Sequence, residues 1–121
     1  MIGYINLGTN QFDRAADFYD QLLSLIGAQR VAGGDRFVAW AMASGEPMLS
    51  IIKPYDGEPA TVGNGVMVAL KVASRQSVDA LHARALALGG SDEGAPGMRG
   101  PFYAAYFRDL DGNKLNAFCL Q

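Results

Sequence analysis

Apolar residues recur along the first part of the chain with two different periods, and each period predicts one kind of element. Residues 2–8 form a short apolar-rich run, typical of a strand, that ends in a glycine. Apolar side chains then recur at helical spacing from Phe12 to Ile26, which predicts a helix. Asn10 is placed to cap the start of this helix, and Gly27 is placed to end it in a left-handed conformation.

Glycine residues divide the next segment into strands. Gly33-Gly34 predicts a hairpin turn between two short strands within residues 28–43, and a further strand is expected over 47–53. Residues 54–65 are dense in glycine and proline, which predicts a connection without regular structure. The first half of the chain therefore reads as strand, helix and three strands.

The same order of elements follows in the second half. Residues 65–72 read as a strand, and residues 75–88 read as a helix with Ser74 as its cap. A glycine- and proline-rich stretch over 94–101 reads as a connection to two final strands, which an Asp111-Gly112 turn joins. This repeat predicts an α+β fold with two modules, about 1–60 and 61–121, that pack together as a single domain because each is small.

Composition and charge narrow the classes of partner. Half of the 121 residues are hydrophobic, 18% are charged and the formal net charge is -2, as in an ordinary globular protein. No basic run interleaved with aromatic residues occurs, so we expect no nucleic-acid partner. No apolar run approaches the roughly 20 residues of a membrane span and no secretion signal is visible, so we expect no membrane partner and a cytoplasmic location. The single cysteine, Cys119, excludes an internal disulfide and is expected to be a buried apolar residue.

Two local features could indicate a catalytic or metal-binding site, but neither matches the pattern that such a site requires. A calcium-binding EF-hand loop has glycine at its sixth position and glutamate at its twelfth, whereas counting from Asp109 places Gly112 fourth and Leu120 twelfth. The segment therefore predicts a hairpin turn. His82 is the only histidine, and the sequence places no nucleophile or carboxylate beside it, so we expect a structural role.

Alternation along the strands separates two kinds of face. One face of each strand is uniformly apolar and is expected to lie under a helix. The other face mixes apolar, aromatic and polar side chains, which suits either a solvent-exposed sheet or a mostly apolar pocket, and its large side chains favour the pocket. Trp40 can fall on either side, and Arg99 is either a rim contact for a carboxylate or phosphate or a solvated surface charge. The candidate ligand-binding residues are Tyr4, Asn6, Trp40, Ser50, Met67, Arg99, Tyr106 and Asn116.

Three stretches carry a resemblance to a known family. They are GYINLGTNQFDRAADFYDQLLSLIGA at 3–28, GNGVMVALKV at 63–72 and YFRDLDGNKLNAF at 106–118. On these stretches the sequence resembles a small single-chain member of the vicinal oxygen chelate superfamily, which includes glyoxalase I, bleomycin-resistance proteins and extradiol dioxygenases. The resemblance implies two tandem βαβββ modules whose curled mixed sheets form a cup, and it implies a homodimer.

The resemblance also implies where a metal would be held. Metal-binding members use four inward side chains, usually histidine or glutamine and glutamate, and the corresponding positions here are Tyr4, Ser50, Met67 and Asn116. None of these four supplies the carboxylate or imidazole that a divalent ion prefers, so we expect no metal and no cofactor. The expected function is the binding of a small, partly apolar organic molecule. Two alternatives stay open: a lyase, isomerase or dioxygenase with unconventional ligands, and an antibiotic-sequestering resistance protein.

Overall fold

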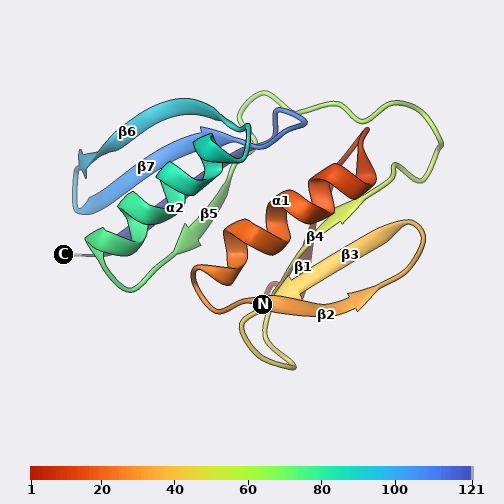
Figure 1. Cartoon of the computed structure of the whole chain (residues 1–121), viewed down its shortest axis with the longest axis horizontal. Coiled ribbons are helices and arrows are strands. Elements are labelled where there is room, and N and C mark those ends of the chain that lie inside the picture. The colour runs from red at the N-terminus through yellow and green to blue at the C-terminus, as the bar shows by residue number, and fades with distance from the viewer. Residues whose placement is uncertain (121) are drawn as a thin grey trace. The chain divides into compact units, whose positions relative to one another are not determined.

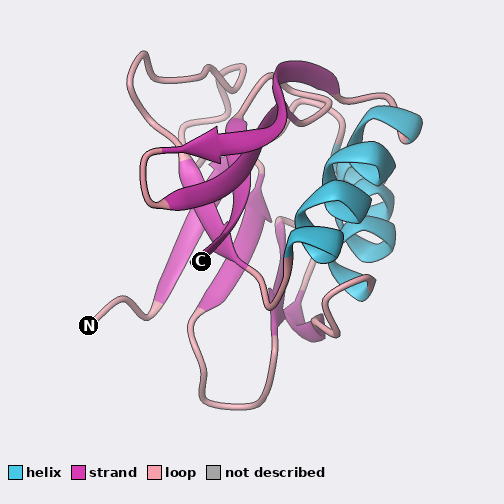
Figure 2. Cartoon of the chain, turned by 90° about the vertical axis from the view of Figure 1, so that its left-hand side faces the viewer, coloured by secondary structure: helices cyan, strands magenta, loops and turns pink. Residues whose placement is uncertain are grey.

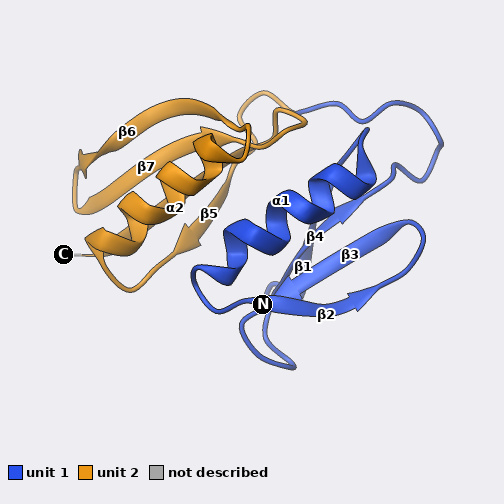
Figure 3. Ribbon diagram, in the orientation of Figure 1, with its two compact units in different colours: residues 1–62 blue, residues 63–121 orange. Residues whose placement is uncertain are grey.

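The computed structural model describes residues 1–120, and the chain falls into two compact units that meet in sequence at Val62 and Gly63 (Figure 3). Each unit contains a strand, a helix and three further strands in chain order (Figure 1). Each forms one mixed sheet of four strands. The predicted α+β class and the tandem βαβββ modules are therefore confirmed. Within residues 1–120, neither helix has the length and apolar character needed to cross a membrane.

The first unit builds its sheet around a parallel pair of strands. Strand β1 lies parallel to β4, and β3 and β2 follow in antiparallel pairing, which gives the order β1-β4-β3-β2. Helices lie on one side of the strands (Figure 2). In the first unit α1 contacts β2 and β4 and leaves the other face of the sheet without a helix from the same unit. The elements are β1 Tyr4–Gly8, α1 Phe12–Ser24, β2 Gln29–Gly33, β3 Phe37–Ala41 and β4 Met48–Ile52. The side chains that α1 buries are Ala15, Ala16, Phe18, Tyr19, Leu22 and Leu23, which recur at helical spacing.

The start of α1 differs from its prediction. The N-cap residue is Gln11 and not Asn10. The Asn10 amide instead pairs with the backbone of Ala60, because its Nδ2 donates to the Ala60 carbonyl at 3.0 Å and its Oδ1 accepts from the Ala60 N–H at 2.7 Å. Gly8 lies against the same residue, so closely that a Cβ at position 8 would come within 2.9 Å of the Ala60 Cβ. At the other end, Gly27 has the predicted left-handed conformation, with φ of 86°.

The second unit repeats this topology, with the sheet order β5-β8-β7-β6 and the parallel pair β5 and β8. The elements are β5 Val68–Lys71, α2 Arg75–Ala87, β6 Ser91–Arg99, β7 Phe102–Arg108 and β8 Lys114–Leu120. Ser74 caps α2 as predicted, since its Oγ accepts a hydrogen bond from the Ser77 N–H at 3.1 Å. Cys119 is buried, as expected for a small apolar side chain.

Two predicted boundaries in this unit are wrong. The stretch 94–101 was expected to be a connection, but β6 continues through it to Arg99. An edge strand tolerates glycine and proline, and the pairing of β6 with β7 shifts register on both sides of Gly94. Strand β5 begins only at Val68, after a turn in which Gly65 has a φ of 94° and the Val66 N–H donates to the Gly63 carbonyl; Met67 thus precedes the strand.

The segment between β7 and β8 is a turn organised by one buried carboxylate. Asp109 is 5% exposed, and its Oδ1 accepts hydrogen bonds from the backbone N–H groups of Asp111 and Asn113, both at 2.9 Å. Its Oδ2 accepts from the Asn113 side-chain amide at 3.0 Å. Gly112 supplies the positive φ that the turn needs. Both carboxylate oxygens thus face N–H donors, which agrees with the predicted hairpin turn and leaves the calcium-loop interpretation without support.

Candidate ligand pocket

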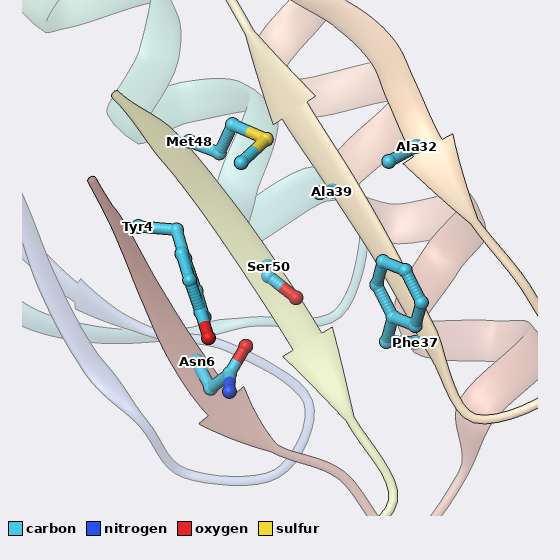
Figure 4. A pocket seen from close by; sticks show the side chains of 7 residues that line it. All are labelled: Tyr4, Asn6, Ala32, Phe37, Ala39, Met48 and Ser50. Carbon is cyan, nitrogen blue, oxygen red and sulfur yellow. The ribbon is translucent and has the colours of Figure 1, made fainter. Parts of the chain in front are cut away.

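A pocket of about 320 Å³ lies on the face of the first sheet that α1 does not cover. All four strands of this sheet contribute to it (Figure 4). This is the mixed face that strand alternation predicted. The lining residues are Tyr4 and Asn6 from β1, Met48 and Ser50 from β4, Phe37 and Ala39 from β3, and Ala32 from β2.

The register of the strands arranges these side chains in rows. Asn6 lies opposite Ser50, Ser50 opposite Ala39, and Ala39 opposite Ala32, so one row of short side chains crosses the whole sheet. Tyr4 lies opposite Met48 in the next row on one side of it, and Phe37 belongs to the next row on the other side. The short row forms the floor of the pocket and the large side chains rise beside it.

The polar groups of the pocket are uncharged. Ser50 is 2% exposed, and its Oγ makes one long hydrogen bond, 3.3 Å, to the carbonyl of the adjacent Ile51. The Tyr4 side chain is 62% exposed at the rim. No Asp, Glu, Lys or Arg is among the lining residues. The pocket can therefore offer hydroxyl and amide hydrogen bonds together with apolar and aromatic surface.

Trp40 does not lie on this face, which corrects the expectation that it contacts the ligand. Its side chain is 2% exposed, its ring centroid lies 5.6 Å from that of Tyr19 on α1, and its Nε1 donates to Asp20 Oδ1 at 2.9 Å. On β3 the neighbouring Ala39 takes the pocket side. Trp40 is placed by its contact with α1, and alternation alone could not decide between the two faces.

Asp20 on α1 also pairs with Arg30, which lies opposite Trp40 in the sheet. The Arg30 Nε and Nη2 atoms reach the two Asp20 oxygens at 2.8 and 2.7 Å. The Arg30 hydrogen bond, together with that from Trp40, holds the pKa of the Asp20 carboxyl below its usual value despite partial burial.

This lowered pKa makes one stability term depend on pH. The stabilisation is present above the unfolded pKa of about 3.9 and is lost as the pH falls through the lower, folded pKa. We expect Asp20→Asn, which keeps an acceptor for Trp40, to lower the free energy of unfolding by about 0.5 kcal/mol at pH 7, a small value because both partners are more than a third exposed. In urea unfolding experiments, the difference from the wild type should shrink as the pH is lowered from about 3.9 through the folded pKa. A constant difference from pH 7 to pH 2 would contradict the assignment to ionised Asp20.

The other predicted site residues lie in the second unit and are not among the lining residues of this pocket. Asn116 lies opposite Ala69 on one side and Tyr106 on the other, in a row that matches the floor of the first sheet. Here Tyr106 stands where the first unit has Ala39. The Arg99 guanidinium carbon and the Lys114 Nζ lie 5.7 and 5.5 Å from the centre of its ring.

Asn116 and Met67 differ in how they are exposed. Asn116 is 6% exposed, and its Oδ1 is buried without a hydrogen-bond partner among residues 1–120. Met67 is 40% exposed and lies just before β5. Arg99 is held locally, since its Nη2 donates to the Ala95 carbonyl at 2.9 Å.

The metal that the resemblance implies does not fit the side chains at its expected positions. Tyr4 and Ser50 belong to the first unit, Met67 and Asn116 to the second, and all four are neutral groups. A dehydrated divalent ion needs anionic oxygen or imidazole ligands to offset its lost hydration. Within residues 1–120, no three His, Cys, Asp or Glu side chains come together in a way that could hold a metal ion.

His82 has a partner that the sequence did not reveal. Its Nε2 lies 2.9 Å from Asp92 Oδ1 on β6, ten residues along the chain. The Gly94 N–H donates to the same oxygen. The hydrogen bond from Gly94 and, to a lesser extent, the one with His82 hold the pKa of the Asp92 carboxyl below its usual value. The pair joins α2 to the irregular start of β6, which agrees with a structural role for His82.

The pocket also contains residues that the sequence reasoning did not single out: Ala32, Phe37, Ala39 and Met48. Met48 follows from alternation, since it lies two residues before Ser50 on β4 and shares its face. Phe37 and Ala39 follow from alternation once Trp40 is assigned to the helix side. Ala32 is hard to identify from the sequence, because a small side chain that leaves room for a ligand carries no chemical signal.

The sequence and the fold both match a known protein family. A family model described as "Glyoxalase/Bleomycin resistance protein/Dioxygenase superfamily" matches residues 1–117. The solved structure of a glyoxalase/bleomycin resistance protein from Albidiferax ferrireducens is similar at 33% identity, with a TM-score of 0.93, and the alignment covers 100% of this chain and 99% of that one. No curated protein matches the sequence.

Two more distant structures share the fold. A lactoylglutathione lyase from Agrobacterium tumefaciens is 22% identical with a TM-score of 0.70, over 98% of this chain and 92% of that one. An antibiotic binding protein from a Streptomyces species is 20% identical with a TM-score of 0.71, over 100% of this chain and 96% of that one. At these identities the likeness concerns the fold alone.

Proposed function

The chain belongs to the glyoxalase/bleomycin resistance protein/dioxygenase superfamily, and from that premise we propose that it binds a small organic molecule without the help of a metal. The observation that carries the proposal is the pocket on the first sheet, whose polar groups are a phenol, an amide and a hydroxyl and whose remaining lining is apolar. Ligand pockets usually combine apolar walls with a few placed polar groups in this way. The two modules are proposed to act as one domain, with a homodimeric state and a cytoplasmic location as further predictions.

Binding of a small organic molecule is a function for which this fold offers a precedent. One structure of similar fold is that of an antibiotic binding protein. The proposal does not extend to lyase, isomerase or dioxygenase chemistry, because the four positions expected to hold a metal carry Tyr, Ser, Met and Asn. It also favours an uncharged ligand, since no lining side chain offers a formal countercharge.

The test is a thermal-shift screen of the purified protein against uncharged alcohols, phenols and ketones, with and without EDTA. We expect compounds that raise the melting temperature equally in both conditions. We expect their affinity to fall about tenfold in Tyr4→Ala, which removes the aromatic wall beside β1. Tyr55→Ala is the matched control, because Tyr55 is 91% exposed and lies outside the pocket lining.

Two outcomes would contradict the proposal. Binding that EDTA abolishes, and that added zinc or nickel restores, would show that a metal is needed. A second variant, Asn6→Trp, places a bulky side chain over the pocket floor from an exposed strand position that accepts aromatic residues well. Ligands that bind Tyr4→Ala and Asn6→Trp with unchanged affinity would show that binding occurs elsewhere.

A further inference from the structure

We infer that the pocket takes a flat, uncharged ring compound that carries a hydroxyl or carbonyl group on one edge. This inference deepens the proposed function and rests on it. Three features of the pocket lead to it independently: the shape of the floor, the chemistry of the walls and the uneven distribution of polar groups.

The floor is long and even. The row of Asn6, Ser50, Ala39 and Ala32 crosses four neighbouring strands, which at a strand spacing of about 4.8 Å corresponds to roughly 14 Å from end to end. The other three side chains of this row, beyond Asn6, are a serine and two alanines, so no large side chain stands in the row along β4, β3 and β2. A planar molecule can lie along this row, whereas a branched or globular one loses contact with it.

The large side chains beside the floor favour a ligand with an aromatic ring. Tyr4 and Met48 border the floor on one side, and Phe37 borders it on the other (Figure 4). Aromatic side chains bind other aromatic rings in stacked or edge-to-face arrangements, and a methionine sulfur contacts ring edges favourably. A volume of about 320 Å³ is near the lower end of ligand pockets, so the compound has few rings.

Polar groups gather at one end of the pocket. The Tyr4 ring extends along β1 with its hydroxyl toward the end where Asn6 and Ser50 lie (Figure 4). The Asn6 amide and the Tyr4 hydroxyl have no hydrogen-bond partner among residues 1–120, so both are available to a ligand. The β3 and β2 end is lined by Phe37, Ala39 and Ala32. The ligand is thus expected to place its polar edge against β1 and β4 and its apolar body over β3 and β2.

Three probes of similar size test this inference by isothermal titration calorimetry with the full chain. 2-Naphthol is flat, uncharged at neutral pH and polar on one edge. 2-Naphthoate keeps the flat ring and adds a negative charge, and decahydro-2-naphthol keeps the hydroxyl and loses planarity. We expect 2-naphthol to bind at least about tenfold more tightly than either of the others, because a bare charge finds no countercharge here and a puckered ring loses contact with the floor and walls.

Variants assign this preference to the pocket. Asn6→Ala should weaken 2-naphthol binding about fivefold, the effect of one hydrogen bond. Phe37→Leu keeps an apolar side chain and removes the ring, so it should weaken 2-naphthol binding and narrow its advantage over decahydro-2-naphthol. Phe102→Leu on β7 is the matched control. Phe102 is 40% exposed and Phe37 is 37% exposed, but only Phe37 lines the pocket.

The outcomes separate this inference from the proposed function. If 2-naphthoate or decahydro-2-naphthol binds as tightly as 2-naphthol and Asn6→Ala weakens that binding, the pocket functions but the inferred ligand class is wrong. If 2-naphthol binds and none of the pocket variants changes its affinity, the inference fails because binding is elsewhere. If none of the three probes binds, the flat-ring class is excluded, and the proposed function is then decided by the Tyr4→Ala screen alone.

Discussion

Trp40→Ala is expected to lower the free energy of unfolding by about 4 kcal/mol, the loss typical of a large aromatic side chain removed from a core. Trp40 is 2% exposed and packs against Tyr19, so alanine leaves a cavity between the sheet and α1. It also removes the indole N–H that donates to Asp20 at 2.9 Å. Urea unfolding followed by circular dichroism measures the difference, with the midpoint and slope of the transition fitted separately.

Two further variants show whether this effect arises from the core. Tyr55→Ala removes an aromatic ring that is 91% exposed and should change stability by less than about 0.5 kcal/mol. Trp40→Phe keeps most of the packing, and the folded variant should bind pocket ligands with wild-type affinity. If Trp40→Phe kept wild-type stability and lost ligand binding, Trp40 would belong to the ligand face after all.

Asp109→Ala is expected to lower the free energy of unfolding by about 3 kcal/mol, because three N–H donors lose their acceptor where little water can replace it. Those donors are the backbone groups of Asp111 and Asn113 and the side-chain amide of Asn113. Asn113 is itself 8% exposed. Thermal and urea unfolding of the variant measure the loss.

A second aspartate in the chain offers a matched comparison. Asp56 Oδ1 accepts one backbone hydrogen bond from Glu58 at 3.0 Å at an exposed turn, so Asp56→Ala should cost about 0.5 kcal/mol or less. Equal losses for the two variants would show that burial of Asp109 does not matter. Calcium is expected to leave the melting temperature of the wild type unchanged, and a rise with calcium that Asp109→Ala removes would restore the metal-loop interpretation.

The elements that the sequence predicts well are those decided by local interactions. The extents of α1 and α2 follow from the helical spacing of their apolar residues and from short-range signals such as the Ser74 cap and Gly27. The Asp111-Gly112 turn is equally local. Strand β6 was missed because glycine and proline argue against a strand, whereas pairing with β7 and an edge position permit one.

The pocket could be predicted only in part. Alternation assigned Tyr4, Asn6 and Ser50 to the mixed face, and the structure brings these three together. Trp40 was misplaced because its side of β3 is decided by contacts with α1, a helix separated from it in sequence. Alanine gives no chemical signal of its own, so Ala32 and Ala39 become recognisable only when strand register shows that they continue the floor.

Ala60 contacts both Gly8 and Asn10, so the segment that leaves the first module is fixed to the carboxyl-terminal end of β1 in that same module. Residues inserted between β4 and Ala60 would loosen this attachment at the end of β1, the strand that carries Tyr4 and Asn6. Spacers, tags or cleavage sites intended to separate the halves therefore belong in residues 61–65, beyond this anchor. A longer tether there leaves the backbone beneath Tyr4 and Asn6 undisturbed.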